Sequence, residues 1–337
     1  MLIIDSPLCD PHFNIAAEEY LLKETDRDFA FFYINEPSVI IGKHQNAWSE
    51  INHGWTWRNN IPVVRRISGG GTVWHDLGNL NFAFILNGQE GKLVNFREYA
   101  SPVLEYLISL GIPAEFGERN EMIASGLKIS GNAEHVHRKR VLHHGTLLFS
   151  SDLSNLREAL DTDPDLYVDK SVQSVRSKTG NIRDFLYNTM VIEEFRKGLL
   201  TFIARHYKGS EEYVFSKPDI DRIEELVRLK YSLWSWNVGY SPTYNLEREI
   251  DMDSLRLRAE LKVEKGQIKE CSISTIFGVP SAKREADDLE YKEIPNLNEL
   301  SVHLIGAMHD PDVLRDLISA RDLVKPDWID TFVEGLF

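Results

Sequence analysis

Residues 65–79 have the sequence RRISGGGTVWHDLGN, in which three consecutive glycines follow two arginines. Glycine has no side chain and adopts positive φ easily, so the backbone N–H groups of such a run can converge on an anion. The two arginines can supply a bidentate contact to a phosphate or a carboxylate. No Gly-Lys-Ser/Thr sequence follows, and no helix is predicted directly after the glycines, so this is neither a P-loop nor a dinucleotide-binding motif. The stretch predicts either an anion site of another kind or a tightly turned hairpin loop without a ligand.

The second motif is GLKISGNA at residues 126–133. On a strand, Leu127 and Ile129 lie on one side, and Lys128 and Ser130 lie on the other. A lysine held on a short strand between glycines can contact a carboxylate or a phosphate as a point charge. The alternative is an exposed lysine on an edge strand, where such charges prevent edge-to-edge pairing. The residues alone leave both interpretations open.

Four histidines follow the lysine motif. His135 and His137 lie on one face if the segment is extended, and His143 and His144 follow a short basic run at 137–140. Two such pairs across a hairpin can bind a transition metal. Because neither Cys-x-x-Cys nor His-Glu-x-x-His is present, we favour surface or hydrogen-bonded histidines and predict no metal site in the protein. The basic run itself is interpreted as a solvated hairpin tip.

The residues around these motifs predict an α/β (α+β) protein with two domains. The run NFAFIL at 81–86 is apolar and short enough to be a strand buried on both faces. We predict a larger domain over residues 1–245, with a mixed, mostly antiparallel sheet flanked by helices. Apolar spacing predicts helices at 14–23, 96–110, 191–207 and 219–230 and strands at 29–34, 38–41, 61–67, 81–86, 121–124 and 127–130.

The pattern changes from about residue 246. Apolar and charged residues alternate from 255 to 264, which is typical of a strand with one buried face. Lys265 and Gly266 supply a turn, and a second strand follows. Helices near 296–308 and 311–321 complete a small α+β unit. We therefore predict a C-terminal accessory domain over residues 246–337.

Composition restricts the class of protein. The chain has 337 residues and a formal net charge of −14, which argues against a nucleic-acid-binding protein with a basic face. Its two cysteines, Cys9 and Cys271, are too few and too far apart for a disulfide framework. The N-terminus lacks the basic and apolar regions of a signal peptide, and no stretch approaches the ~20 apolar residues of a membrane span. We expect a soluble, cytoplasmic protein without a membrane or nucleic-acid partner.

Both motifs resemble those of a known family. Residues 65–79 closely resemble the Arg-Arg-x-Ser-Gly-Gly-Gly-Ala-Val-aromatic-His-Asp-x-Gly-Asn block of lipoate–protein ligases, and residues 127–133 resemble their Lys-x-Ser-Gly-Ser-Ala block. The segment PSVIIGKHQN at 37–46 is similar to their Pro-x-x-x-x-Gly-Arg-x-Gln-Asn segment, with weaker matches at 144–148 and 170–176. The resemblance covers residues 1–245, and the remainder looks like the accessory domain of the two-domain, A-type members.

The resemblance implies an ATP-dependent acid–amine ligase. The lipoate carboxylate would attack the α-phosphorus of ATP to give lipoyl-adenylate and pyrophosphate. A lysine ε-amine of an acceptor would then attack the mixed anhydride and release AMP. The implied small molecules are ATP, Mg²⁺ and lipoic acid, with Mg²⁺ offsetting triphosphate charge. The implied partners are the lipoyl domains of 2-oxoacid dehydrogenase E2 subunits and the H protein of glycine cleavage.

The same resemblance assigns roles by position. Lys128 matches the essential lysine, which contacts the adenylate phosphate and the acyl oxygen as a cation, and Arg66 matches the arginine that contacts the nucleotide. Further adenylate contacts fall to Gly71, Thr72, Val73, Trp74 and Asn79, and the lipoyl side to His75 and Gly70 together with Lys128. Four residues depart from the family pattern: Lys43 for arginine, Thr72 for alanine, Trp74 for phenylalanine or tyrosine, and Asn132 for serine.

Other functions are discriminated by particular residues. An octanoyl- or lipoyltransferase of the same fold works through an acyl-thioester and needs a thiolate in the pocket, whereas Cys9 and Cys271 lie outside all the motifs. A non-catalytic relative that only binds lipoate or its adenylate would be marked by loss of Lys128 or of the glycine run. Biotin ligases share the general architecture but have a different arginine–glycine pattern.

Overall fold

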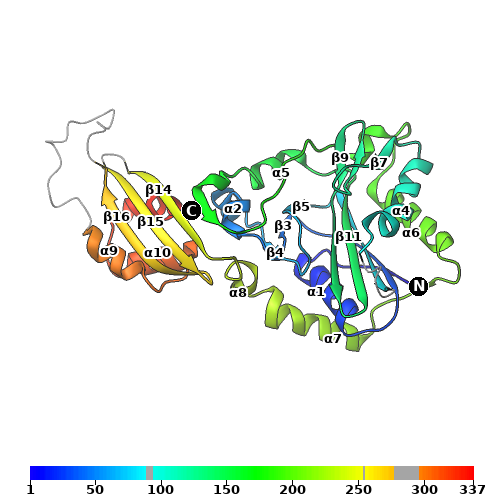
Figure 1. The fold of residues 1–337 in the computed structure, drawn as a ribbon, viewed down its shortest axis with the longest axis horizontal. Helices are drawn as coiled ribbons and strands as arrows, with labels where there is room; N and C mark the ends of the chain where they lie inside the picture. The colour runs from blue at the N-terminus through cyan, green and yellow to red at the C-terminus, as the bar shows by residue number, and fades with distance from the viewer. Residues whose placement is uncertain (89–93, 253–254, 277–295) are drawn as a thin grey trace. The chain divides into compact units, whose positions relative to one another are not determined.

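The computed structural model describes residues 1–88, 94–252, 255–276 and 296–337 (Figure 1). The chain divides into two compact units. Unit 1 consists of Met1–Lys43, Asn59–Leu160 and Ser174–Asn237, and unit 2 consists of His44–Arg58, Asp161–Gln173 and Val238–Phe337. The sequence analysis places one boundary at residue 245, whereas in the structure two segments from earlier in the chain pack with the C-terminal residues.

Unit 1 is built on a six-stranded sheet. Its strand order is β10-β11-β6-β2-β1-β13, where β1 runs parallel to β2 and β13 and the other neighbours are antiparallel. The prediction of a mixed, mostly antiparallel sheet is thereby confirmed. The strands are β1 (Leu2–Asp5), β2 (Phe29–Ile34), β6 (Asn79–Asn87), β10 (Asn132–His137), β11 (Arg140–Leu148) and β13 (Glu211–Glu212).

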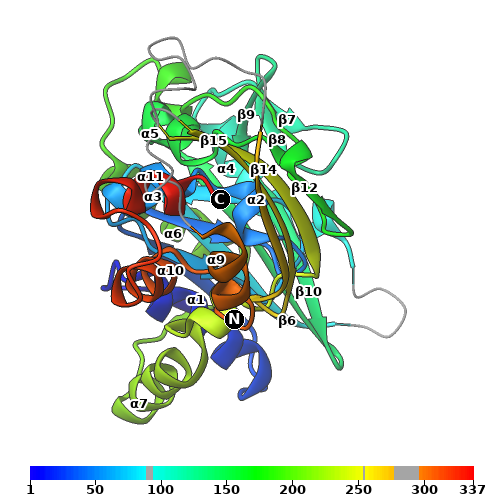
Figure 2. The same ribbon diagram turned by 90° about the vertical axis from the view of Figure 1, so that its left-hand side faces the viewer.

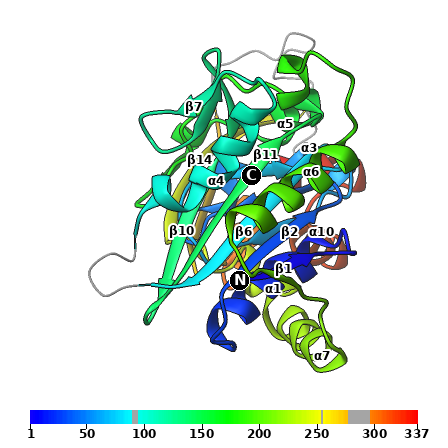
Figure 3. The same cartoon turned by 90° about the vertical axis from the view of Figure 1, so that its right-hand side faces the viewer.

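Helices cover both faces of this sheet (Figures 1 and 3). On one face, α1 (Pro11–Lys23) and α7 (Lys217–Leu226) pack on alternate residues of β2, namely Phe29, Phe31 and Tyr33. On the other face, α4 (Phe96–Ser109) and α6 (Ile192–His206) pack on the intervening residues Ala30, Phe32 and Ile34. Side chains of a strand point alternately to its two faces, so a strand covered on both sides must be apolar throughout. β6 follows the same rule, as the sequence predicts.

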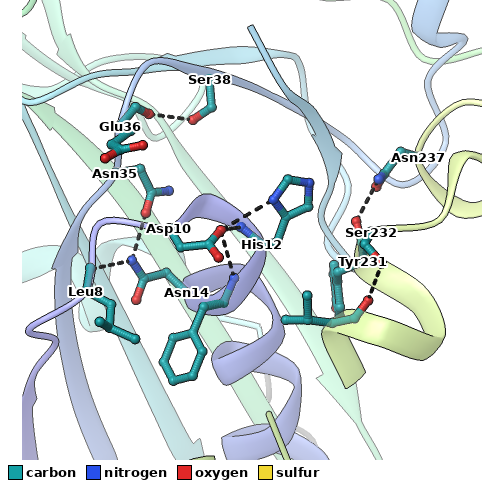
Figure 4. A network of polar contacts seen from close by, with 12 residues as sticks. Leu8, Asp10, His12, Asn14, Asn35, Glu36, Ser38, Tyr231, Ser232 and Asn237 are labelled. Carbon is teal, nitrogen blue, oxygen red and sulfur yellow. Dashed lines mark hydrogen bonds and ion pairs between the residues drawn. The ribbon is translucent and has the colours of Figure 1, made fainter. Parts of the chain in front are cut away.

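The start of α1 is fixed by a polar network (Figure 4). Asp10 caps the helix by accepting from the N–H groups of His12, at 2.8 Å, and of Phe13. Within the first turn, Asn14 donates to the carbonyl of Leu8 at 2.9 Å and to the side chain of Asn35 at 2.8 Å. The helix therefore begins three residues before the apolar pattern suggests, and its buried polar face connects it to the end of β2.

Two three-stranded sheets of unit 1 carry the sequence motifs. One has the order β4-β3-β5 and the other the order β7-β8-β9. In the β8–β9 hairpin, Ser125 and Gly126 form the predicted turn with φ of 48° and 81°. The strands are β3 (Ser38–Ile41), β4 (Val63–Arg65), β5 (Val73–His75), β7 (Ala114–Phe116), β8 (Met122–Ala124) and β9 (Leu127–Ser130), and the short helices of the unit are α5 (Leu153–Ala159) and α8 (Trp234–Asn237).

Unit 2 has an antiparallel sheet with helices on one face (Figure 2). The strand order is β12-β14-β15-β16, and Lys265 and Gly266, both with positive φ, connect β15 to β16 as predicted. Along β15 the apolar residues are buried and the charged ones are at least partly exposed. The elements are α2 (Ala47–Glu50), α3 (His53–Arg58), β12 (Tyr167–Asp169), β14 (Tyr244–Met252), β15 (Leu255–Glu264), β16 (Gln267–Thr275), α9 (Leu297–Leu304), α10 (Pro311–Ala320) and α11 (Ile329–Glu334).

Within the described ranges, every helix is too short or too polar to cross a bilayer.

Candidate active site

The two sequence motifs lie beside each other in unit 1. The glycine loop, Ser68–Thr72, connects β4 to β5, and the lysine block, Leu127–Ala133, runs from β9 into β10. A Cβ atom on Gly70 would lie 3.7 Å from the Cβ of Ala133, which is van der Waals contact. Gly70 has a φ of 84°, a conformation that residues with a side chain rarely adopt. The loop therefore needs this glycine to reach its position against the lysine block.

A third stretch, the closing segment from Ser174 to Gly180, contacts both motifs. A Cβ atom on Gly71 would lie 2.9 Å from the Oγ of Ser174 and 3.2 Å from its Cα, so this position has no room for a side chain. At the other end, the N–H of Lys128 donates to the carbonyl of Lys178 at 2.8 Å, and the N–H of Gly180 donates to the carbonyl of Lys128 at 3.1 Å. The backbone of Lys128 is thus held from the side opposite β8.

The side chain of Lys128 is a largely buried cation. Burial lowers its pKa, the nearby Glu121 raises it, and the positive charges of Arg66 and Arg119 lower it. Among the described residues, Nζ forms neither a hydrogen bond nor an ion pair. A Cβ atom on Gly131 would lie 3.4 Å from Nζ, so the glycine leaves space beside the ammonium group. Because a desolvated cation without a counter-ion is costly, this arrangement favours an anionic ligand.

Arg66 shapes the glycine loop. Its guanidinium donates to the carbonyls of Gly69, at 2.6 Å, and Gly71, at 2.7 Å, and also to Ile40 at 3.0 Å, while its Nε donates to the Oγ of Ser68 at 3.0 Å. Its donors are therefore directed at protein atoms, and its positive charge lowers the pKa of Lys128. A direct contact of Arg66 with a nucleotide stays a prediction.

Arg65 makes different contacts from those of Arg66. Its side chain is 0% exposed. The guanidinium donates to the carbonyls of Trp236 and Asn237, each at 3.1 Å, and of Gly42 at 2.9 Å. These bonds tie β4 to the short helix α8. Only one of the two adjacent arginines thus lies at the glycine loop, a distinction that sequence alone does not make.

Behind the loop lies a buried polar chain that the sequence did not reveal. The Oγ of Ser68 lies 2.6 Å from Nε2 of His144, and Nδ1 of His144 lies 2.7 Å from a carboxylate oxygen of Glu18. The other oxygen of Glu18 accepts from the hydroxyl of Tyr33 at 2.9 Å. Burial, together with the Glu18 charge, raises the pKa of Tyr33 well above its usual value, so its hydroxyl remains a donor. This series of hydrogen-bonded side chains extends from α1 to the glycine loop.

His75 is buried in a second polar chain. Its Nδ1 lies 2.9 Å from the amide nitrogen of Asn35, whose oxygen accepts from Asn14 at 2.8 Å. An amide nitrogen only donates, so Nδ1 is the acceptor and the ring proton is on Nε2. Burial, together with the charges of Arg66 and His144, lowers the pKa of His75 to about 3. His75 is therefore neutral at physiological pH.

The remaining predicted site residues differ in accessibility. Gly71, Thr72 and Val73 are partly exposed, whereas Trp74 is 1% exposed and donates from Nε1 to Asp76 at 3.0 Å. The indole of Trp74 is thus a buried packing group. Asn79 is fully buried and donates to Asn81 at 2.9 Å. Within the described part of the chain, its Oδ1 has no hydrogen-bond partner.

The four histidines do not converge. His143 lies 2.9 Å from Glu134, its cross-strand neighbour, and His144 belongs to the chain behind the loop. His135 and His137 lie on the β10 face shared with Ala133. Over the ranges that the structure describes, no group of three or more His, Cys, Asp and Glu residues is arranged to hold a metal ion.

Both cysteines are free thiols and neither lies in the three segments of the site. Cys271 is on β16 of unit 2, where burial raises its pKa to about 11. A thiol with such a pKa is almost entirely protonated at neutral pH and is a poor nucleophile.

The family model and the most similar curated proteins described here all belong to the same family. The family model of the lipoyl protein ligase A/B catalytic domain matches residues 10–204. Lipoate-protein ligase LplJ of Bacillus subtilis is 37% identical over 98% of this chain and 99% of its own length. Lipoate–protein ligase 1 of Staphylococcus aureus is 37% identical over 95% of this chain and 94% of its own length.

Solved structures agree with these relatives. A Thermoplasma acidophilum lipoate protein ligase with bound lipoic acid has a TM-score of 0.61 and 27% identity, covering 71% of this chain and 98% of that one. A lipoate-protein ligase A bound with ATP also has a TM-score of 0.61 and 27% identity, covering 71% of this chain and 98% of that one. A further structure, of the bipartite T. acidophilum ligase and its E2 lipoyl domain, has a TM-score of 0.61 and 27% identity, covering 71% and 96%.

Proposed function

The chain belongs to the lipoate–protein ligase family, and we propose on that premise that it activates free lipoate with MgATP and transfers the lipoyl group to a lysine of an acceptor domain. The observation that carries the proposal is Lys128, a largely buried cation beside a glycine loop whose Nζ forms no ion pair with the residues that the structure describes. Both the adenylate phosphate and the developing acyl oxyanion are anionic, so one preorganised cation can stabilise both steps.

In the first step, a carboxylate oxygen of lipoate attacks the α-phosphorus of ATP. The bond from this phosphorus to the bridging oxygen breaks, and pyrophosphate leaves with the electron pair. Lys128 is proposed to contact the α-phosphate, and the partly exposed residues Gly71, Thr72 and Val73 to lie along the nucleotide. A bound phosphate also favours the charged form of Lys128 and offsets the effect of burial on its pKa. Mg²⁺ enters with the triphosphate as part of the MgATP substrate.

In the second step, the neutral ε-amine of the acceptor lysine attacks the carbonyl carbon of lipoyl-adenylate. The bond from this carbon to the phosphate oxygen breaks, AMP leaves, and the amine loses a proton to solvent. Lys128 is proposed to stabilise the acyl oxygen as negative charge develops there. It acts as a positioned cation and forms no covalent bond.

The other assignments are proposals of lower detail. Arg66 and Asn79 are proposed to act on the nucleotide. Arg66 would do so through the loop carbonyls it holds, and Asn79 through its Oδ1, which accepts no hydrogen bond from the described part of the chain. Trp74 is proposed to contribute its backbone. Neutral His75 and the exposed Gly70 are proposed to lie on the lipoyl side.

The acceptors are proposed to be E2 lipoyl domains and the H protein of glycine cleavage. The T. acidophilum lipoylation system, described as a bipartite ligase and its E2 lipoyl domain, supports the first of these. We propose that residues 1–245 are catalytic and residues 246–337 accessory. Because both cysteines are free thiols, we also propose a reducing, cytoplasmic location.

Two assays separate the half-reactions. Lipoate-dependent exchange of labelled pyrophosphate into ATP reports adenylate formation, and the intact mass of an apo lipoyl domain reports transfer. The proposal predicts both activities with lipoate and MgATP. Exchange without transfer would point to a different acceptor. Absence of exchange, with transfer observed only from an octanoyl carrier, would replace the ligase by a transferase.

A further inference from the structure

A strip of basic side chains leads away from the glycine loop on unit 1. The strip consists of Lys23, Lys43, His135, His137, Arg138 and Lys230. It begins at the loop itself, because the N–H of Lys43 donates to the carbonyl of Ser68 at 2.8 Å. It continues along β10, where His135 and His137 occupy the same face as Ala133, whose Cβ would lie 3.7 Å from a Cβ on Gly70. It ends at Arg138, in the exposed hairpin tip between β10 and β11.

The members of the strip lie close to one another. Glu19 is buried between Lys23, at 2.7 Å, and Lys230, at 2.6 Å, and the ammonium group of Lys230 lies 3.9 Å from the ring centre of Trp236. Arg140 holds the hairpin against the end of α1 through the carbonyls of residues 21 and 22. Burial lowers the pKa of His135 to about 4, and the charges of Lys43 and Lys23 contribute.

The strip has a net positive charge on a strongly acidic protein. Lys23, Lys43, Arg138 and Lys230 contribute four positive charges, and the acid between them, Glu19, contributes one negative charge from a buried position. The balance is +3, against −14 for the whole chain. A local field of the sign opposite to the net charge is able to orient an incoming partner.

The dimensions favour a folded partner over a small molecule. β10 rises about 3.4 Å per residue, so the strip extends roughly 14 Å from Ala133 to His137. One phosphate or carboxylate bound at Lys128 is too small to neutralise charges spread over that distance. The transfer reaction, on the other hand, requires an acceptor protein to cover the surface beside the loop while its lysine enters.

We propose that the basic strip docks the acceptor domain, and that it selects acceptors whose surface around the target lysine is acidic. This inference rests on the proposed transfer to a protein lysine. It adds the charge pattern of the partner and names the surface that recognises it.

The test compares two double variants with the same change in charge. Lys23→Gln/Arg138→Asp alters the strip, and aspartate tolerates the φ of 56° at position 138. Lys197→Gln/Arg205→Asp alters exposed residues of α6, on the opposite face of the sheet. The measurements are pyrophosphate exchange, the KM for ATP, and the KM for an apo lipoyl domain at low and high salt.

For the strip variant we expect the KM for the acceptor to rise about tenfold at low salt, with a flatter salt dependence. Exchange and the KM for ATP should equal those of the wild type, and the α6 variant should match the wild type throughout. Replacing carboxylates around the acceptor lysine by amides should raise the KM of the wild type but not that of the strip variant.

Three results would overturn the inference: an unchanged acceptor KM in the strip variant, an equal rise in the α6 variant, or a rise in the KM for ATP instead. Failure of the proposed function is recognised separately, because the wild type itself would then show no lipoate-dependent exchange.

Discussion

Lysine side chains on two strands of this protein have opposite surroundings. On β15 of unit 2, Lys262 lies in an exposed ladder and pairs with Glu270 at 2.9 Å. On β9 of unit 1, Lys128 is largely buried, and over the described ranges its Nζ has neither a hydrogen bond nor an ion pair. An exposed pair contributes little to stability and serves mainly to keep a sheet surface soluble. A buried cation without a partner costs stability, and this arrangement favours an anionic ligand at Lys128.

The space around two glycines, one in each unit, also differs. Near Lys128, the chain approaches so closely that Gly71 has no room for a Cβ beside Ser174. In unit 2, a Cβ on Gly54 would meet only the flexible end of Arg58, at 3.3 Å. The glycine loop therefore leaves no room for a side chain at Gly71, whereas α3 has room for one at Gly54.

Replacing Gly71 by alanine should have the largest effect. The new methyl group would push the loop away from Ser174, and displacement of reacting groups by about 1 Å costs roughly 100-fold in rate. We expect lipoate-dependent exchange to fall by at least about 100-fold, while Gly54→Ala keeps the wild-type rate. Equal rates for the two variants would show that the loop geometry is not required.

The free energy of unfolding should depend on pH through His75. His75 has a pKa of about 3 in the folded chain against 6.5 for an exposed histidine. The unfolded chain therefore binds more protons, so the stability is complete above pH 6.5 and is lost as the pH falls toward 3. Between pH 7.5 and 5 this residue should account for a loss of about 2 kcal/mol. Urea unfolding of His75→Gln should show a correspondingly smaller loss, and an identical pH profile would contradict the burial of a neutral ring.

Ser68→Ala should have an intermediate effect. It removes the hydroxyl that links Arg66 to His144, at 3.0 and 2.6 Å, and leaves buried polar groups unpaired. Such a loss costs about 1–3 kcal/mol, and we expect exchange to fall about tenfold as the loop loosens. Urea titrations and exchange rates test this. Ser68→Thr, which restores the hydroxyl, should recover part of both.

Arg258→Ala should have the smallest effect. Arg258 lies on the exposed face of β15, 3.3 Å from Glu247 and 3.5 Å from Glu249. Because the pairs are solvated, we expect no measurable change in exchange or in transfer to the acceptor. A marked loss of transfer alone would give the unit 2 sheet a role in acceptor binding that the comparison does not assign to it.

Much of the fold follows from local pattern. Strands β2 and β3 have the predicted bounds, because each is an apolar run ended by turn residues. The alternation at 255–264 identified β15 for the same reason. The segments 44–58 and 161–173 could not be assigned to unit 2, because their packing depends on distant residues. Trp48, for example, packs on Phe337 with ring centres 5.0 Å apart.

The main residues of the site could be predicted from the sequence, but the hydrogen bonds that hold them in place could not. The glycine run and Lys128 are conspicuous in sequence, and the structure brings them together. The bond between Ser68 and His144 joins residues 76 positions apart, and that between His144 and Glu18 joins residues 126 positions apart. No local pattern encodes such contacts. For the same reason, sequence could not assign Arg65 to α8 and Arg66 to the loop.

The central claim is that Lys128 is kept for an anionic intermediate, and the most direct test compares Lys128→Met with Lys262→Met. For each variant, urea unfolding gives the stability, and the intact mass of a lipoyl domain incubated with lipoate and MgATP gives the activity. We predict that Lys128→Met is no less stable than the wild type and loses about 10²–10³-fold in rate. Lys262→Met should keep full activity. A Lys128→Met protein that retains lipoyl transfer, or that loses activity only because it unfolds, would contradict the account.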